Sequence, residues 1–334
     1  MVQGMTESAL DEEGVVEPVE LKNLAASFQR IHDNIERIIE GKGEEIRLAL
    51  VVLLAEGHLL IEDVPGVGKT MLAKSLARSI DCSVRRIQFT PDLLPSDVTG
   101  VSIFNQELRD FEFKPGAIFA NIVVGDEINR ASPKTQSALL ECMEEHQVTV
   151  DGMTYVLGEP FMVIATQNPI EMEGTYPLPE AQRDRFTARL SMGYPSARAE
   201  MDMLDSHGFA SPLDELQPVA DAAEIGRMID AVRRVHVAEG IKRYVIDVVT
   251  ATREHRDLRL GASPRASLQL LRAARAFAAT EGRGFVVPDD VQAMAVHVLS
   301  HRLLPTAEAQ IARRDPEEVV REILSRLPVP APGR

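Results

Sequence analysis

The stretch LLIEDVPGVGKTMLAKSLA, residues 59–77, constrains the fold of this 334-residue chain more than any other segment. A short apolar run ends in a turn rich in Pro and Gly, Lys-Thr follows, and a helical repeat of apolar residues begins. A strand that leads through such a loop into a helix directs backbone N–H groups and the positive end of the helix at an anion. The stretch therefore predicts a phosphate-binding loop.

Lys69 and Thr70 would supply the chemistry of this loop: Lys69 can reach β- and γ-phosphate oxygens, and the Thr70 hydroxyl can ligate Mg²⁺. The strict loop pattern has Gly where this chain has Asp63, but the backbone must approach phosphate most closely at Gly66 and Gly68. Because Asp tolerates unusual backbone angles, we expect Asp63 to be compatible with nucleotide binding, and Asp63→Gly to change affinity little. The alternative is an ordinary Gly-rich turn, which the strand and helix flanks disfavour. The predicted binding residues are Pro65, Gly66, Val67, Gly68, Lys69, Thr70 and Met71.

Two further apolar runs, NIVVGDE and FMVIATQN, end in polar side chains and predict buried strands. The first ends at Asp126 and Glu127, the second at Asn168. These ends are expected to lie beside the phosphate loop at the carboxyl edge of the sheet. There Asp126 could hold Mg²⁺, Glu127 could activate a water for attack on the γ-phosphate, and Asn168 could hydrogen-bond that water or the phosphate. Taken alone, a solvated acidic pair and a turn-capping Asn are the alternatives.

The pattern of elements changes near residue 194. Before it, apolar runs alternate with helical segments, which predicts a parallel sheet covered on both faces. After it, amphipathic helices follow one another and strand signals almost vanish. We expect an acidic disordered tail, an α/β nucleotide-binding domain, a linker, an α-helical domain and a C-terminal segment. These correspond to residues 1–20, 21–193, 194–215, 216–310 and 311–334.

Composition limits the partners and the location of the chain. The net charge is −15, and an acidic chain is repelled by phosphate backbones, so nucleic acid is not an expected partner. The two cysteines, Cys82 and Cys142, form neither a disulfide framework nor a zinc motif. The first 20 residues carry six acids and no Lys or Arg, unlike a secretory signal, and the longest apolar run, 48–55, is too short to span a bilayer. We therefore predict a cytoplasmic protein without membrane insertion.

Several segments, in order over about residues 21–305, resemble the motifs of the MoxR family of AAA+ ATPases. They are EDVPGVGKT, DEINRASPKTQSALLECMEE, ATQNPIEMEGTYPLPEAQRDRF and GASPRASLQLLRAARA, of which the run EGTYPLPEAQ is especially specific. Gly125 departs from the family, which usually has a larger or Ala-like residue there, and Asp63 departs from the generic loop. The resemblance implies an α/β AAA+ P-loop domain with a central parallel sheet, followed by an all-α helical lid.

The resemblance also implies roles for two arginines. Arg185, in AQRDRF, matches the arginine finger, which stabilises transition-state charge in a neighbouring subunit's site. On the sequence alone, Arg183 and Arg189 compete for that role. Arg265, in GASPRAS, matches the sensor-2 arginine of the lid and would be aimed at the γ-phosphate of its own chain.

The implied activity is Mg²⁺-dependent hydrolysis of ATP to ADP and phosphate. Ile39 and Gly41, in IIEGKGEE, match the region that packs against adenine, and the chain lacks the N-K-x-D motif for guanine. The implied assembly is a homo-oligomeric ring, expected to be a hexamer. It would remodel or activate a partner protein, commonly one with a von Willebrand factor A domain. The segments TPDLLPSDVTGVSIF, FEFKPGAIF and QVTVDGMTYVL match family insertions that would face the pore and the partner.

Three other functions stay open on the sequence. The chain could be a nucleic-acid-linked motor or regulator, although its acidic charge and its lack of a basic or helix-turn-helix appendage count against this. It could be a subunit of a metal-inserting chelatase, a relative that also works with a von Willebrand-type partner. A binding module that is gated by nucleotide without useful hydrolysis ranks last, because all of the catalytic residues are present.

Overall fold

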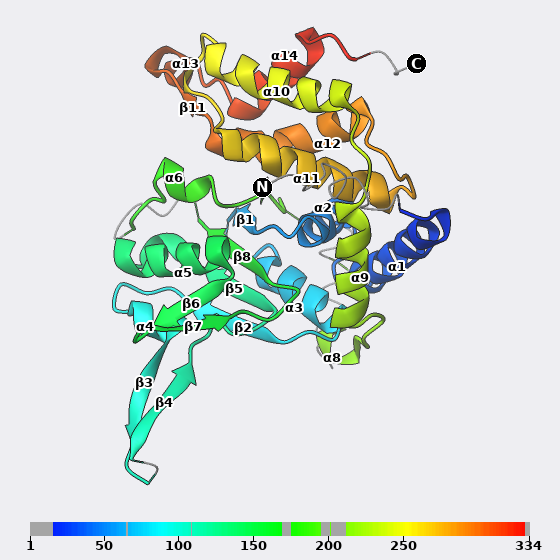
Figure 1. Ribbon diagram of the computed structural model, residues 1–334. Helices are drawn as coiled ribbons and strands as arrows, with labels where there is room; N and C mark the ends of the chain where they lie inside the picture. Colours follow the sequence, from blue (N-terminus) through cyan, green and yellow to red (C-terminus); the bar gives the residue numbers. More distant parts are fainter. Residues whose placement is uncertain are drawn as a thin grey trace, which may run out of the picture.

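The computed structural model describes residues 16–64, 66–107, 109–168, 175–194 and 212–330, together with residue 201. Its centre is a sheet of five strands in the order β2-β5-β8-β1-β9, in which every neighbouring pair is parallel (Figure 1). This confirms the predicted α/β class. The strands are β1 (Leu59–Glu62), β2 (Val84–Gln88), β5 (Ile122–Asp126), β8 (Met162–Gln167) and β9 (Ala188–Leu190).

Different helices cover the two faces of this sheet. In β1, Leu59 and Ile61 belong to one buried cluster and Leu60 to another, because successive side chains of a strand point to opposite faces. The first cluster includes apolar residues of α1, α2 and α3, and the second includes those of α5. The helices are α1 (Pro18–Glu36), α2 (Gly43–Leu54), α3 (Lys69–Ser79), α4 (Pro95–Thr99) and α5 (Pro133–Glu145).

Helix α1 begins at Pro18, inside the segment predicted as a tail. Pro at the first helical position and a capping box between Glu17 and Glu20 start the helix there. Leu21 and Leu24 are buried, so residues 18–20 belong to a packed helix. The rest of the predicted tail, residues 1–15, lies outside the described residues, as does most of the predicted linker 194–215.

A helical region follows and packs above the sheet (Figure 1). Its described elements are helices and one two-stranded antiparallel pair, β10–β11. Its last helix buries Val319, Val320 and Ile323, so the packed region extends beyond residue 310, where the lid was expected to end. Its elements are α8 (Pro212–Glu215), α9 (Ala222–Arg233), α10 (Glu239–Glu254), β10 (Leu258–Leu260), α11 (Pro264–Thr280), α12 (Pro288–Leu299), η2 (Ser300–Arg302), β11 (Leu304–Pro305), α13 (Ala307–Ile311) and α14 (Pro316–Arg326).

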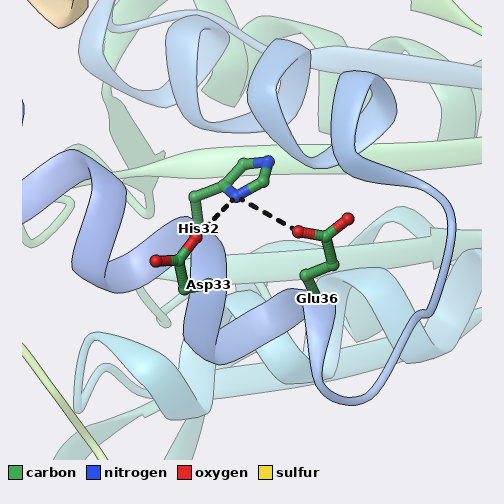
Figure 2. A group of neighbouring side chains, drawn as sticks. All are labelled: His32, Asp33 and Glu36. Atoms are coloured by element: carbon green, nitrogen blue, oxygen red, sulfur yellow. Dashed lines mark hydrogen bonds and ion pairs between the residues drawn. The ribbon is translucent and has the colours of Figure 1, made fainter.

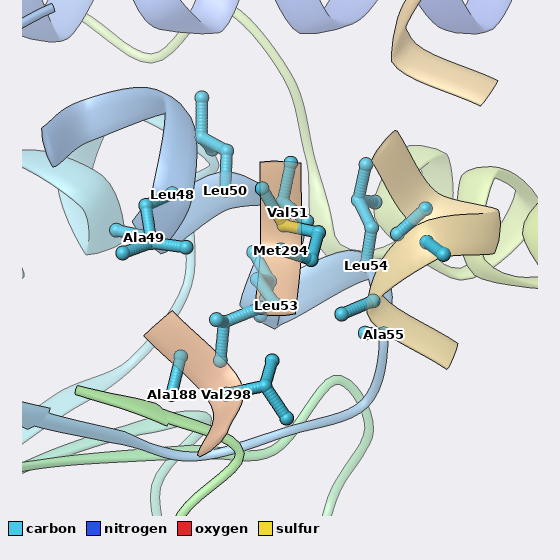
Figure 3. Close-up of a cluster of buried hydrophobic side chains, with 14 of the residues drawn as sticks. Leu48, Ala49, Leu50, Val51, Leu53, Leu54, Ala55, Ala188, Met294 and Val298 are labelled. Carbon is cyan, nitrogen blue, oxygen red and sulfur yellow. The ribbon is translucent and has the colours of Figure 1, made fainter. Parts of the chain in front are cut away.

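Helix α2 joins the two regions. Its sequence is apolar on almost every side, and Leu48, Val51 and Leu54 lie in the same buried cluster as Met294 and Val298 of α12 (Figure 3). Burial of this kind contributes about 1.5–3 kcal/mol for each large apolar side chain. The sheet and the helical region are therefore packed on one continuous core.

Two pairs of described strands form hairpins outside the central sheet. In the first, the turn at Asp151-Gly152 has positive φ at both residues and joins β6 (Gln147–Val150) to β7 (Met153–Val156). The second hairpin pairs β3 (Gly100–Asn105) with β4 (Asp110–Pro115) and projects far from the sheet (Figure 1). None of the described helices combines the length and apolar character needed to cross a bilayer.

Candidate active site

The loop between β1 and α3 has the backbone that its glycines require. Gly66 and Gly68 have φ of 86° and 91°, a region that other residues rarely adopt. Lys69 is the first residue of α3, and its Nζ donates to the backbone carbonyl of Asp63 at 2.7 Å. Burial lowers the pKa of Lys69, while Asp63, Asp126 and Glu127 oppose this shift. The amine is therefore held inside the loop, among acceptors that a phosphate could replace.

The other predicted nucleotide contacts lie in this loop, in α3 and in the turn between α1 and α2. Val67 and Met71 pack against the core cluster beneath α3, and Ile39 is buried in the turn between α1 and α2, where Gly41 has φ of 74°. Pro65 lies outside the described residues.

Asp126 ends β5 directly beside the loop. The Thr70 hydroxyl donates to its Oδ2 at 3.2 Å, and the Thr166 hydroxyl of β8 donates to its Oδ1 at 3.3 Å. The Arg86 Nε of β2 also donates to Oδ2, at 2.6 Å. A carboxylate and a hydroxyl oxygen at this spacing are suitable ligands for Mg²⁺.

Glu127 follows in a left-handed conformation, with φ of 58° and ψ of 49°. Such a backbone costs about 1–3 kcal/mol in a non-Gly residue and persists only where its surroundings enforce it. Its N–H donates to the Thr166 hydroxyl at 3.1 Å, and its carboxylate accepts from Gln88 Nε2 at 2.8 Å. Arg130 lies 3.3 Å from the same carboxylate. The turn thus directs Glu127 away from the strand and fixes it at the mouth of the loop.

Asn168 immediately follows β8 and is buried at the same edge, where β8 pairs with β1. The structure therefore brings the predicted residues Lys69, Thr70, Asp126, Glu127 and Asn168 to the carboxyl edge of adjacent strands. Arg86 and Gln88 were missed. Their signal was the polar composition of VRRIQ, but it becomes informative only once β2 is known to pair with β5, with Gln88 opposite Asp126.

Asp63 is engaged away from the phosphate loop. Its Oδ2 accepts from the Gly193 N–H at 2.6 Å and from the Ser191 hydroxyl at 2.9 Å, and its Oδ1 accepts from the Val64 N–H at 2.8 Å. Partial burial would raise the pKa of Asp63, but these hydrogen bonds outweigh burial and lower it. The residue that replaces the usual glycine thus ties the end of β1 to the end of β9.

Arg185 and Arg265 lie together at the other edge of the sheet. An Arg185 Nη2 is 3.1 Å from Glu144 Oε2, and Arg265 pairs with the other oxygen of the same carboxylate. Glu144 is near the end of α5, where the Met143 carbonyl contacts His58, the residue before β1. A cavity of about 230 Å³ beside this group is lined by His58, Glu144, Arg185, Arg265 and Arg272, among others.

The expectation that Arg265 points to the γ-phosphate of its own chain does not hold in this structure. Its partners, Glu144 and Asp184, lie at the amino edge, and β1 runs between them and the phosphate loop. Sequence reasoning could not find this, because the position depends on how the lid docks.

The competing arginines differ in their surroundings. Arg189 bridges Glu62 at 3.0 Å and Glu317 of α14 at 2.7 Å, so its charge is used within the chain. Arg183 ends a short helix, α6 (Glu180–Arg183), two residues before Arg185.

Among the described residues, one cluster of potential metal ligands lies apart from this site, on α1 (Figure 2). His32 Nδ1 is 3.3 Å from Asp33 Oδ1 and 3.7 Å from Glu36 Oε2. The other ring nitrogen contacts the Gly43 carbonyl at 2.9 Å. Because these contacts connect α1 with the start of α2, we interpret the cluster as a structural link.

Comparisons with known proteins identify the family. A model of the ATPase family associated with various cellular activities (AAA) matches residues 58–188, and a model of the AAA lid domain matches residues 250–323. Chaperone MoxR1 of Mycobacterium tuberculosis is 40% identical over 313 residues, which cover 91% of this chain and 82% of that protein. The chain belongs to the MoxR family of AAA ATPases. As a member of this family, it binds and hydrolyses ATP.

Other relatives of this MoxR-family ATPase agree. Protein MoxR of Methylorubrum extorquens is 30% identical over 92% of this chain and 96% of its own length. The uncharacterized protein YeaC of Bacillus subtilis is 51% identical over 89% of this chain and 93% of its own length. A crystal structure from Cytophaga hutchinsonii, provisionally described as an ATPase, has a TM-score of 0.86 at 35% identity and covers 94% of this chain and 98% of that one. An MCM homolog from Methanopyrus kandleri, with a TM-score of 0.56 at 17% identity and coverage of 92% and 62%, shares the fold.

Proposed function

We propose that this ATPase hydrolyses ATP with Mg²⁺ in a closed ring of identical subunits and uses the cycle to remodel a partner protein. The observation that carries the proposal is the division of the site between two edges. Lys69 and Glu127 are at the carboxyl edge, whereas Arg185 and Arg265 are at the amino edge. In a head-to-tail ring, the amino edge of one subunit can meet the carboxyl edge of the next.

At the carboxyl edge, Lys69 would bind the β- and γ-phosphates. Thr70 and Asp126 would hold Mg²⁺, directly or through water, and Arg86 would have to share Asp126 with the ion. The ion supplies positive charge to phosphate oxygens when bound. Glu127, fixed by its left-handed turn, would orient a water and accept its proton. Asn168 would hydrogen-bond the γ-phosphate or the water.

Around these groups, Gly66 and Gly68 would present backbone N–H groups to the phosphates. Val67 and Met71 would lie along the nucleotide, and Ile39 and Gly41 would contact adenine. Pro65 would complete the loop.

At the amino edge, Arg185 and Arg265 would both act on the ATP of a neighbouring subunit. Glu144 supports this proposal, because a carboxylate that binds both guanidinium groups occupies the place that an anionic phosphate would take. Loss of an arginine finger costs about 10³–10⁵-fold in related phosphoryl-transfer enzymes. We therefore expect Arg185→Ala to bind ATP and to hydrolyse it very slowly.

The decisive experiment mixes two inactive variants. Lys69→Ala has an empty pocket and an intact finger, and Arg185→Ala has an intact pocket and no finger. Mixed rings should recover activity, because an Arg185→Ala pocket can meet the Arg185 of a Lys69→Ala neighbour. The control is Lys69→Ala mixed with the Lys69→Ala/Arg185→Ala double variant, which has no intact pocket and should stay inactive.

Wild-type turnover per chain should also rise with protein concentration until rings form. The proposal fails if the mixture stays inactive while fluorescence energy transfer shows that subunits exchange. It also fails if turnover per chain is constant down to a proven monomer.

The ring is proposed to be a hexamer and its partner a protein with a von Willebrand factor A domain. The chaperone designation of the Mycobacterium tuberculosis relative supports a remodelling role. With ATP, Glu127→Gln should retain such a partner longer than the wild type does, whereas Lys69→Ala should not retain it. If the two variants retained the partner equally, partner binding would not depend on the nucleotide cycle, and the remodelling role would fail.

A further inference from the structure

The segment that carries Arg185 is held by the lid. Residues 184–187, here called the finger segment, connect α6 to β9. Arg302, the last residue of η2, reaches this segment from the lid with a side chain that is only 2% exposed. Its Nε donates to Asp184 Oδ1 at 2.9 Å, and its two Nη atoms donate to the backbone carbonyls of Asp184 at 3.3 Å, Phe186 and Thr187 at 3.4 Å.

Two other lid residues complete this contact. The Gln269 Nε2 donates to the Arg185 carbonyl at 3.5 Å, and its Oε1 accepts from Arg302. The His301 Nε2 contacts the Phe186 carbonyl at 3.1 Å. Burial and the charge of Arg302 lower the pKa of His301 well below its usual value, so the ring is neutral at pH 7 and can donate from Nε2. Each backbone carbonyl of the finger segment therefore contacts a donor from the lid.

Arginine is suited to this position. Its planar group presents five N–H donors in a fixed fork, whereas a Lys amine has three donors at one point. Burial lowers the pKa of Arg302 to about 10, and Asp184 opposes this shift, so the side chain stays charged at neutral pH. A buried charge persists only where it is paired and hydrogen-bonded. Replacement by Lys would keep the charge and lose most of the simultaneous contacts.

The finger segment has little other freedom. The Phe186 side chain is fully buried, and Ser263, at the start of α11, donates to Asp184 at 2.8 Å. Arg185 itself extends to the cavity beside Glu144. The backbone on both sides of Arg185 is thus fixed from the lid, while its half-buried side chain ends at the cavity beside Glu144.

We propose that Arg302 is a positioning residue for the arginine finger, so that the placement of the lid sets the position of Arg185 toward a neighbouring subunit. This inference rests on the proposed action of Arg185 in trans. It extends the proposed action of Arg185: if the lid of one subunit shifts, it would move the Arg185 that acts on the ATP of the next subunit.

Arg302→Lys tests the proposal. A displacement of about 1 Å in a catalytic group can cost on the order of 10²-fold, so turnover should fall by about that factor. The phosphate loop of the variant is untouched, so its ATP affinity should change by less than about twofold. Mixing with Lys69→Ala should restore turnover, because Lys69→Ala subunits supply correctly placed fingers.

Two further variants keep the test clear if Arg302→Lys folds poorly. Gln269→Ala removes the hydrogen bond to the Arg185 carbonyl and leaves Arg302 in place. This smaller change should lower turnover several-fold, again with ATP affinity unchanged. Arg283→Lys is the matched control, because Arg283 pairs with the buried Asp290 inside the lid, away from the finger segment. It should lower the melting temperature and leave turnover per folded ring unchanged.

The outcomes separate this inference from the proposed function. If Lys69→Ala rescues Arg185→Ala but not Arg302→Lys, or if Arg302→Lys keeps wild-type turnover, Arg302 does not position the finger. If Arg185→Ala is not rescued either, the trans mechanism itself fails. In the double variant Arg185→Ala/Arg302→Lys, turnover should be no lower than in Arg185→Ala alone.

Discussion

The two edges of the central sheet carry different groups of the proposed site. At the carboxyl edge, Lys69, Asp126 and Glu127 lie at a loop with two glycines of positive φ. At the amino edge, Arg185, which precedes β9, and Arg265 of α11 both pair with the carboxylate of Glu144. Protein groups hold the reactive side chains at both edges: the Asp63 carbonyl holds Lys69, and Glu144 holds Arg185. Under the proposed mechanism, the difference means that the carboxyl edge would bind the subunit's own nucleotide, whereas the amino edge would act on the nucleotide of a neighbouring subunit.

Lys69→Ala should have the largest effect on the carboxyl edge, because it removes the Lys amine that would bind the phosphates. ATP binding should be lost, as measured by titration calorimetry, and turnover should disappear with it. Lys74→Ala is the control, since Lys74 is an exposed residue of the same helix. Retained ATP binding in Lys69→Ala would show that the loop does not hold the phosphates.

Glu127→Gln should separate binding from hydrolysis within the carboxyl edge. The amide keeps the shape of the side chain and cannot accept a proton, so turnover should fall by at least ~10²-fold while ATP binding persists. Single-turnover phosphate release measures the loss. Unchanged turnover would move the base to another residue.

Glu144→Gln tests the amino edge, because it removes the ion pairs that hold Arg185 and Arg265. The ion pairs of Glu144 are partly exposed, and exposed pairs contribute about 0.2–1 kcal/mol each. Freeing the two arginines should therefore raise turnover by less than about tenfold in assembled rings. Glu145→Gln, a change at the neighbouring exposed acid, should have no effect. A fall in turnover would mean that Glu144 assists the arginines instead of competing with phosphate.

Of these substitutions, Asp63→Gly should change nucleotide affinity least. Because the carboxylate points to residues 191–193, ATP affinity should change by less than about twofold, although stability should fall by about 1 kcal/mol through lost hydrogen bonds. Ser191→Ala removes one of these bonds from the other side and should lose less stability. A large gain in affinity on Asp63→Gly would show that the loop is degenerate.

The pH dependence of Asp63 has a definite sign. Its folded-state pKa is lowered, so the carboxylate stabilises the fold above its unfolded-state pKa of about 3.9, and this contribution is lost as the pH falls through the folded-state value. The wild type should exceed Asp63→Asn in stability at pH 7, and the two should converge in acid.

The carboxyl edge was largely predictable from sequence, and the amino edge was not. Lys69, Asp126 and Asn168 follow apolar runs along the chain, so local patterns place them at strand ends. The contact of Arg86 with Asp126 depends on strand order, and the position of Arg265 depends on lid docking. Both are long-range properties that periodicity does not encode.

Local signals were also misjudged in places. Pro18 and the capping pair of Glu17 and Glu20 start α1, yet in the sequence these acids resemble the rest of an acidic tail. The segment between β3 and β4 contains no tight-turn dipeptide, so the sequence did not predict that these strands pair.

The β3–β4 hairpin has the geometry of a lever arm. Each strand has six residues, and at ~3.3 Å per residue the arm is about 20 Å long. Phe104 and Phe111 face each other along it, with ring centroids 5.4 Å apart and both rings exposed. A tilt of about 10° at the base would sweep the end of such an arm through about 3–4 Å. A modest rotation of the nucleotide-binding body would therefore displace the end of the hairpin by about the size of a side chain.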